Sequence, residues 1–147
     1  MRAFVALLRA HAAAIRGLNA QLVEDHGLTI NDYEVLFRLA HAPDRRMRRV
    51  DLAAEVLLTA SGVTRLLDGL ERAGYVERGA CDTDRRVVYA VLTDAGLDKL
   101  RAASKTHVAQ IEELFRAHFE ENDVVTLASL LGRLDGEVEP DADCSPE

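Results

Sequence analysis

Hydrophobic residues recur at spacings of three and four positions through most of the chain, which is typical of amphipathic helices. The first stripe covers residues 2–24 and comprises Phe4, Leu8, His11, Ile15, Leu18 and Leu22. Gly27 follows it and predicts the end of this helix. A second helix is predicted with Asn31 as its N-cap and Glu34 as the capping-box partner. Pro43 is expected to end that helix.

The middle of the chain predicts a helix followed by a hairpin. Thr59 suits the N-cap of the helix. Its buried face would consist of Val63, Leu66, Leu67 and Leu70, at positions i, i+3, i+4 and i+7. Gly74 suits the C-terminal stop. Residues 75–78 and 87–92 then flank a polar turn, and this pattern indicates a small β hairpin.

Two further helices complete the pattern. Thr93 is expected to cap a long helix whose inner face would carry Leu97, Leu100, Ser104, His107, Ile111, Leu114 and His118. A last helix is predicted to begin at Asn122 or Asp123. Residues 138–147 contain two prolines and several acids and are predicted to form a disordered tail. The predicted fold is therefore mainly α with a small β hairpin.

The first and last helices carry more apolar side chains than a lone small domain needs to bury. Pairing of two copies through these helices would cover them, and a two-fold axis would then relate the copies. The alternative is that the two helices pack on each other within one chain. We predict the homodimer.

The charge of the chain is unevenly distributed. The net charge is −7, which disfavours nucleic-acid binding through bulk charge alone. Between Arg45 and Arg86, however, nine arginines face seven acidic residues, a local balance of +2. The basic excess therefore coincides with the predicted helix and hairpin, as expected for a local nucleic-acid footprint.

Several other classes of protein are disfavoured. The two cysteines, Cys81 and Cys144, lack the spacing of a disulfide framework or a zinc site. No apolar stretch reaches membrane-spanning length. Arg9 and Arg16 interrupt the apolar start of the chain, so it does not match a signal peptide, and a cytoplasmic protein is expected. No nucleophile motif, paired-acid signature or phosphate-binding glycine loop occurs, so we expect neither an enzyme nor a cofactor.

The predicted helix and hairpin match the two grooves of DNA. Arg65 offers a bidentate donor fork that fits guanine in the major groove, whereas its alternative role is an ion pair with Asp68 or Glu71. Arg85 and Arg86 at the hairpin tip suit the narrow minor groove, which attracts arginine. The alternative for this pair is a solubilising turn.

An arginine-rich link precedes a brief predicted helix in which Leu52, Ala53 and Val56 point inward. The link contains Arg45, Arg46, Arg48 and Arg49. These side chains could contact phosphate, or they could form a solvated loop, and the sequence leaves both open.

Three segments together resemble the MarR family of bacterial transcription regulators. They are the run Ala-Ser-Gly-Val-Thr-Arg-Leu-Leu-Asp-Gly-Leu-Glu-Arg-Ala-Gly-Tyr-Val, then Asp-Thr-Asp-Arg-Arg, then Leu-Thr-Asp-Ala-Gly. The order of elements agrees from about Phe4 to Gly136. The resemblance implies a winged helix-turn-helix homodimer that binds pseudo-palindromic operators in double-stranded DNA, usually represses, and releases DNA when a small ligand or oxidant arrives.

That resemblance also implies a domain organisation. Residues 1–137 would form a single MarR-like domain, in which helices at about 2–25 and 94–137 dimerise. The winged helix-turn-helix would occupy about 31–93, with the acidic tail at 138–147.

The resemblance assigns roles to individual residues. Ser61, Thr64 and Arg65 fall where the family approaches base edges. Asp84 and Arg86 match the Asp-x-Arg pattern of the wing, in which the carboxylate steadies an arginine that enters the minor groove.

Gly69 stands where the family commonly has arginine, and a glycine within a helix costs about 1 kcal/mol relative to alanine. This departure and the acidic net charge motivate an alternative, a winged-helix protein-interaction module without sequence-specific DNA binding.

The family's effector site suggests further candidates. Members hold phenolic or aromatic carboxylate ligands in a cleft beside the dimerisation helices. By this resemblance Arg9, His11 and Arg16 are candidate ligand-binding residues, and a guanidinium could hold a carboxylate bidentately. The alternative for Arg16 is an interface salt bridge.

A metal-responsive regulator of the same fold is a further alternative. Glu24, His41 and His107 occupy places comparable to the ligands of zinc-sensing members. Ile111, however, stands where those sensors carry a second histidine, so no metal site is predicted. Peroxide-sensing members keep a reactive cysteine in the N-terminal helical region, which this chain lacks. Cys81 near the hairpin is interpreted as a turn residue.

Overall fold

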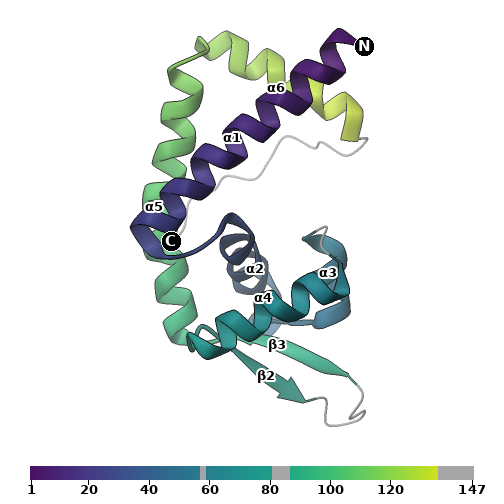
Figure 1. The fold of residues 1–147 in the computed structure, drawn as a ribbon, viewed down its shortest axis with the longest axis vertical. Helices are drawn as coiled ribbons and strands as arrows, with labels where there is room; N and C mark the ends of the chain where they lie inside the picture. Colours follow the sequence, from purple (N-terminus) through teal and green to yellow (C-terminus); the bar gives the residue numbers. More distant parts are fainter. Residues whose placement is uncertain (57–58, 81–86, 136–147) are drawn as a thin grey trace. The chain divides into compact units, whose positions relative to one another are not determined.

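The computed structural model describes residues 1–56, 59–80 and 87–135. Its elements are α1 (Arg2–His26), α2 (Ile30–His41), the 3₁₀ helix η1 (Pro43–Arg45), β1 (Arg46–Arg48), α3 (Arg49–Glu55), α4 (Ala60–Arg72), β2 (Val76–Ala80), β3 (Val88–Leu92), α5 (Asp94–Arg116) and α6 (Glu121–Asp135) (Figure 1). Contacts divide the chain into two compact units, Met1–Gln110 and Ile111 onward. The predicted mainly helical fold with a small sheet is confirmed.

Local capping chemistry explains where the first two helices end and begin. Gly27 takes the left-handed conformation, φ 64°, and ends α1 as predicted. The predicted start of α2 is wrong. Thr29 caps this helix, because its hydroxyl accepts from the Asp32 amide while the Asp32 carboxylate accepts from the Thr29 amide. The capping box therefore lies two residues before the predicted pair, Asn31 and Glu34.

The sheet has three strands in the order β1-β3-β2, with both pairings antiparallel. The predicted hairpin corresponds to β2 and β3, where Val76 pairs with Leu92 and Arg78 with Ala90. The arginine-rich link, for which a solvated loop was one of two alternatives, supplies the third strand. Arg46–Arg48 is only three residues long and contains a single apolar position, which is too short for an alternating pattern to identify a strand.

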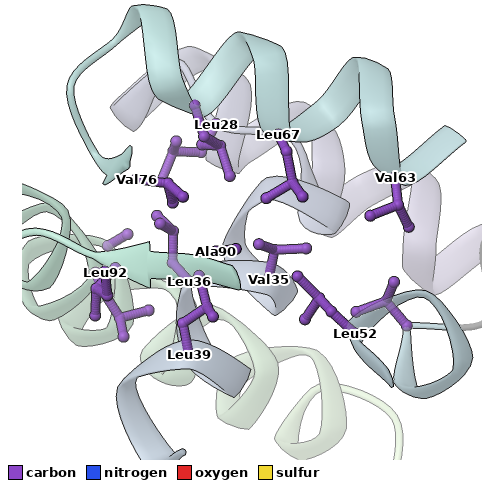
Figure 2. Close-up of a cluster of buried hydrophobic side chains, with 14 of the residues drawn as sticks. Leu28, Val35, Leu36, Leu39, Leu52, Val63, Leu67, Val76, Ala90 and Leu92 are labelled. Atoms are coloured by element: carbon purple, nitrogen blue, oxygen red, sulfur yellow. The ribbon is translucent and has the colours of Figure 1, made fainter. Parts of the chain in front are cut away.

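The core lies within the first unit, where α2, α3 and α4 pack with the sheet. Figure 2 shows Val63 and Leu67 on α4 pointing toward Val35, Leu36 and Leu52. Val63, Leu67 and Leu70 are buried, and Leu66 packs against the cluster while partly buried. The predicted inner face of this helix is confirmed.

A tight joint connects the end of α4 to the start of α5. Thr93 caps α5 as predicted, since its hydroxyl accepts from the Gly96 amide at 3.0 Å. The same hydroxyl donates to the Gly74 carbonyl at 2.7 Å, and the Thr93 amide donates to the Tyr75 carbonyl at 3.1 Å. A Cβ atom on Gly96 would lie only 2.1 Å from that carbonyl oxygen. Glycine is therefore the residue that allows this close approach.

The last part of the chain differs in detail from its pattern. The long helix α5 ends at Arg116, so His118 lies beyond it rather than on its inner face. The last helix begins at Glu121, one residue before the predicted Asn122. Within the described segments, no helix has the length and hydropathy needed to span a bilayer.

Replacing Gly96 with alanine should lower the free energy of unfolding by roughly 1–3 kcal/mol, because the new methyl group would overpack the joint. Chemical unfolding of the variant and the wild-type protein measures the change. Gly69→Ala is the matched control, since nothing lies within 4 Å of a Cβ there. That control should gain up to about 1 kcal/mol from improved helix propensity. Equal stability of Gly96→Ala and wild type would contradict the account of the joint.

Candidate nucleic-acid interface

The outer face of α4 carries the side chains predicted to approach DNA bases. Thr59 caps the helix, and its hydroxyl accepts from the Gly62 amide at 3.1 Å. Because the helix buries its leucine and valine face, the side chains on the opposite face turn outward. Ser61, Thr64 and Arg65 are all exposed there. The structure therefore brings these three predicted residues together on one accessible surface.

Arg65 carries an available guanidinium. Within the described segments it has neither an ion pair nor a hydrogen bond. The alternative partners, Asp68 and Glu71, are instead engaged by Arg78 on β2. The Arg78 Nη2 atom lies 2.9 Å from Asp68 Oδ1, and its Nε atom lies 2.8 Å from Glu71 Oε2. Arg65 is thus an exposed cation on the outer face of α4, and the nearby carboxylates of Asp68 and Glu71 are paired with Arg78.

A network of four charged groups surrounds the C-terminal half of α4. Hydrogen bonding to Glu71 and the charge of that carboxylate are the main causes that raise the pKa of Arg78, with Asp68 adding to the effect. Arg49, at the start of α3, approaches Asp68 with its Nη2 atom 3.9 Å from Oδ1. This network was not predictable from the sequence, because its members lie on three different elements.

The four arginines of the arginine-rich segment all lie within ion-pair distance of acidic residues. Arg48 donates to Asp51 at 2.6 and 3.1 Å, and this hydrogen bonding raises its pKa. Arg45 pairs with Asp94 at 3.0 Å and Arg46 with Asp44 at 3.5 Å, while Arg49 approaches Asp68. The solvated loop considered from the sequence is therefore replaced by a strand and its paired flanks. Phosphate contact by these arginines stays an open alternative.

The hairpin tip lies outside the described residues. Asp84, Arg85 and Arg86, which were predicted to approach the minor groove, fall within this segment, and so does Cys81. The two strands that lead to the tip are described up to the pair Ala80 and Val88.

The candidate effector residues all lie on α1 and form no hydrogen bond or ion pair with one another. Arg9, His11 and Arg16 are all exposed, and none has an ion pair or hydrogen bond to another described residue. An open hollow of about 350 Å³ is lined by Met1, Arg2, Val5, Ala6 and Arg9. Arg9 is therefore the one of the three candidates that borders this hollow.

His107 on α5 is a buried polar group whose side chain contacts α2. Only 4% of its surface is exposed, and its Nδ1 atom has no hydrogen-bond partner in the described part of the chain. Its ring lies 4.7 Å from that of Tyr33, whose hydroxyl is 3.0 Å from Ser104 Oγ. Burial lowers the pKa of His107 because desolvation disfavours the imidazolium.

Aromatic rings continue from Tyr33 along α2 at a spacing of four residues. The ring centroids of Tyr33 and Phe37 lie 6.3 Å apart, and those of Phe37 and His41 lie 4.2 Å apart. The i, i+4 spacing of these three rings is a sequence signal that could have predicted their contacts.

His41 and His107 were considered with Glu24 as metal ligands. Among the described residues, no group of three histidine, cysteine or acidic side chains is arranged to hold a metal ion.

Comparisons with known proteins agree on one family. A sequence model of the MarR family matches residues 26–87. The chain is 30% identical over 121 residues to the HTH-type transcriptional regulator MhqR of Bacillus subtilis, covering 82% of this chain and 81% of that protein. It is 31% identical to the HTH-type transcriptional repressor YetL of the same bacterium, covering 74% of this chain and 66% of that protein.

A solved structure extends the comparison to the whole fold. It is that of Sco3205 from Streptomyces coelicolor, a MarR family transcriptional regulator in complex with DNA. It matches with a TM-score of 0.82 and 27% identity, over 96% of this chain and 89% of that chain.

The burial of His107 predicts a pH dependence of stability. Its pKa in the folded protein lies below the ordinary histidine value of about 6.5, so the unfolded chain binds more protons below that pH. The free energy of unfolding should therefore decrease as the pH falls from about 6.5 toward the folded-state pKa. Urea unfolding at several pH values should show a shallower dependence for His107→Gln.

His11→Gln is the matched control for this experiment, because His11 is exposed. It should keep the wild-type pH dependence. An identical pH dependence in His107→Gln and wild type would show that the buried imidazole does not contribute.

Proposed function

Because the chain belongs to the MarR family and is a DNA-binding transcriptional regulator, we propose that it acts as a homodimeric repressor of a pseudo-palindromic operator. Each copy would place α4 in the major groove of one half-site, with the half-sites about one helical turn apart. The protein would act in the cytoplasm, where its double-stranded DNA target lies.

The observation that carries this proposal is the state of Arg65. It projects from the same exposed face as Ser61 and Thr64, and no described carboxylate pairs with it. A guanidinium in this state can donate two hydrogen bonds to guanine O6 and N7 without first breaking an ion pair. Ser61 and Thr64 add hydroxyl groups that can contact bases or phosphates.

The hairpin would supply the second contact. In this proposal Asp84 steadies Arg86, and Arg85 and Arg86 approach the minor groove beside the half-site that α4 reads. Support for this step comes from the family pattern in the sequence and from the paired strands β2 and β3, which lead to the tip.

Pairing of two copies is supported by apolar side chains left exposed at both ends of the chain. On α1, Phe4 and Leu8 are 59% and 52% exposed. On α6, Val125 and Leu134 are 66% and 75% exposed. Surfaces of this kind are typical of interaction sites. We propose that residues 1–137 act as one MarR-like domain whose helices at about 2–25 and 94–137 form the dimer interface.

Release of DNA would follow the binding of a small ligand, such as a phenolic compound or aromatic carboxylate, beside the dimerisation helices. Arg9, His11 and Arg16 are the proposed contacts. Their exposure leaves the two guanidinium groups available for a carboxylate. The ligand would favour a dimer in which the two α4 helices no longer match the half-site spacing.

Arg65→Ala should weaken binding to the operator found in the protein's own upstream region. Each lost bidentate contact removes about 1–3 kcal/mol of base discrimination, or roughly 5- to 150-fold in affinity. Fluorescence anisotropy titrations with operator and scrambled duplexes measure this loss. Arg38→Ala is the matched control, because this exposed arginine lies on α2, outside both α4 and the proposed dimer helices, and its ion pairs with Glu34 and Glu55 are 3.7 and 3.5 Å long.

The control should bind the operator as wild type does. Equal affinity of the wild-type protein for operator and scrambled duplexes would contradict sequence-specific reading. Unchanged operator binding by Arg65→Ala would favour the alternative, a protein-interaction module, which Gly69 and the net charge of −7 also motivate.

Sedimentation of the protein with its operator tests the assembly and its release together. We expect two chains per duplex, because each α4 would occupy one half-site. Addition of an aromatic carboxylate that raises the melting temperature of the free protein should then release the duplex. One chain per operator would contradict the homodimer, and ligand binding without release would contradict the proposed regulation.

A further inference from the structure

Arg78 on β2 connects this strand to α4 through ion pairs with Asp68 and Glu71. We propose that Arg78 is a positioning residue for DNA reading, which holds α4 through Asp68 and Glu71 and makes no contact with DNA itself. This inference rests on the proposed reading of the operator by α4.

The hydrogen bonds of Arg78 use two nitrogens on one edge of its guanidinium. The Nε atom donates to both carboxylate oxygens of Glu71, at 3.0 Å to Oε1 and 2.8 Å to Oε2. The Nη2 atom donates to Asp68 Oδ1 at 2.9 Å. Asp68 and Glu71 are three residues apart and thus neighbours on one side of the helix. A planar guanidinium that bridges two neighbouring carboxylates restrains both the distance and the rotation of α4 relative to β2.

The strand places Arg78 on the side where this contact is available. Successive side chains of a strand point to opposite faces, so Val76 and Arg78 share one face of β2. Val76 on that face is buried in the core, and the paired residue opposite Arg78 is the buried Ala90. Arg78 therefore lies on the core-facing side of β2, two residues after the buried Val76, and its side chain reaches the carboxylates on α4.

A second arginine reaches the same carboxylate from another element. Arg49 at the start of α3 lies with Nη2 3.9 Å from Asp68 Oδ1, and this nitrogen is buried without a hydrogen-bond partner in the described chain. A cation at a helix N-terminus is disfavoured by the helix dipole, so the nearby Asp68 carboxylate offsets it. Asp68 thus connects α3 and β2 to α4.

The cluster of Arg49, Arg78, Asp68 and Glu71 differs from the proposed DNA contacts in its net charge. Two arginines face two carboxylates, so Arg49, Arg78, Asp68 and Glu71 together carry no net charge. A neutralised Arg78 attracts phosphate less than a free arginine would, and the paired carboxylates repel DNA less. Arg65 lies three residues before Asp68 on the same helix, and no described carboxylate pairs with it. The cluster therefore sets the position of Arg65 while Arg65 contacts the bases.

Such a restraint should be visible in DNA reading more than in folding. Exposed ion pairs contribute little to stability, and the Arg78 side chain is 58% exposed. A binding site, in contrast, needs its contact groups held within about 0.5 Å of the productive geometry. Loss of Arg78 should therefore leave the melting temperature nearly unchanged and still weaken operator binding.

The test uses Arg78→Ala in the full chain, titrated with operator and scrambled duplexes at several salt concentrations. For a positioning role we expect the operator to lose at least 5-fold more affinity than the scrambled duplex, with the salt slope unchanged. The Asp68 and Glu71 carboxylates that lose Arg78 would weaken both duplexes alike. Arg38→Ala controls for the loss of one positive charge. Thermal melting of each variant confirms that it folds.

A double-mutant cycle completes the test. In the Asp68→Asn, Glu71→Gln background the cluster is already broken, so adding Arg78→Ala should have no further effect on operator affinity. Arg78→Lys should recover only part of the loss, because an ammonium group does not present the planar fork.

Two results would overturn the proposal. If Arg78 contacts phosphate, Arg78→Ala will weaken both duplexes equally, reduce the salt slope by about 0.9 per copy and keep its effect in the Asp68→Asn, Glu71→Gln background. Unchanged operator affinity in Arg78→Ala would also reject it. If the wild-type protein itself does not distinguish the two duplexes, the proposed operator reading fails first, and the positioning role fails with it.

Discussion

Burial of one face of α4 is the constraint on which the rest of the structure depends. Val63, Leu67 and Leu70 are at most 3% exposed, and an α-helix has 3.6 residues per turn. Fixing these side chains in the core therefore determines which ones face outward. Ser61, Thr64 and Arg65 are on the outer side for this reason. The chemistry available to DNA is thus a consequence of how the helix packs.

Charge pairing around this helix then decides which groups remain available. The chain is acidic overall, yet the acidic residues nearest to Arg65 along the helix are engaged by Arg78. A net charge of −7 is compatible with DNA binding because local pairing, and not total charge, sets the field at the reading face. The joint at Thr93 and Gly96 adds a second connection, because it attaches the end of α4 to the start of α5.

Features that depend on neighbours in sequence were predictable, and those that depend on distant partners were not. Gly27, Thr59 and Thr93 were identified correctly as helix ends because capping is local. The start of α2 was misplaced because two overlapping capping patterns occur, and the contact from the Asn19 side chain to the Ile30 amide, which is distant in sequence, supports the earlier one. Strand β1 was missed because only its pairing with β3 defines it.

In the candidate site, too, features set by neighbours in sequence were predictable and those set by distant partners were not. The residues on α4 could be assigned from helical spacing and family likeness, and the structure places them on one exposed face. The Arg78 network could not, since its donors and acceptors are seven and ten residues apart and lie on different elements. The partners of Arg65 were also left open by the sequence, because only the structure shows that both carboxylates are occupied.

The most direct test of the central claim is selection of bound duplexes from a pool of random DNA by the full-length protein, followed by sequencing. If a homodimer holds two copies of α4 at a fixed spacing and both contact DNA bases, the selected sequences will contain two inverted half-sites. Their centres should be separated by about one helical turn, 10–10.5 base pairs. A bound pool with no enriched sequence, or with a single half-site and no fixed spacing, would contradict the account.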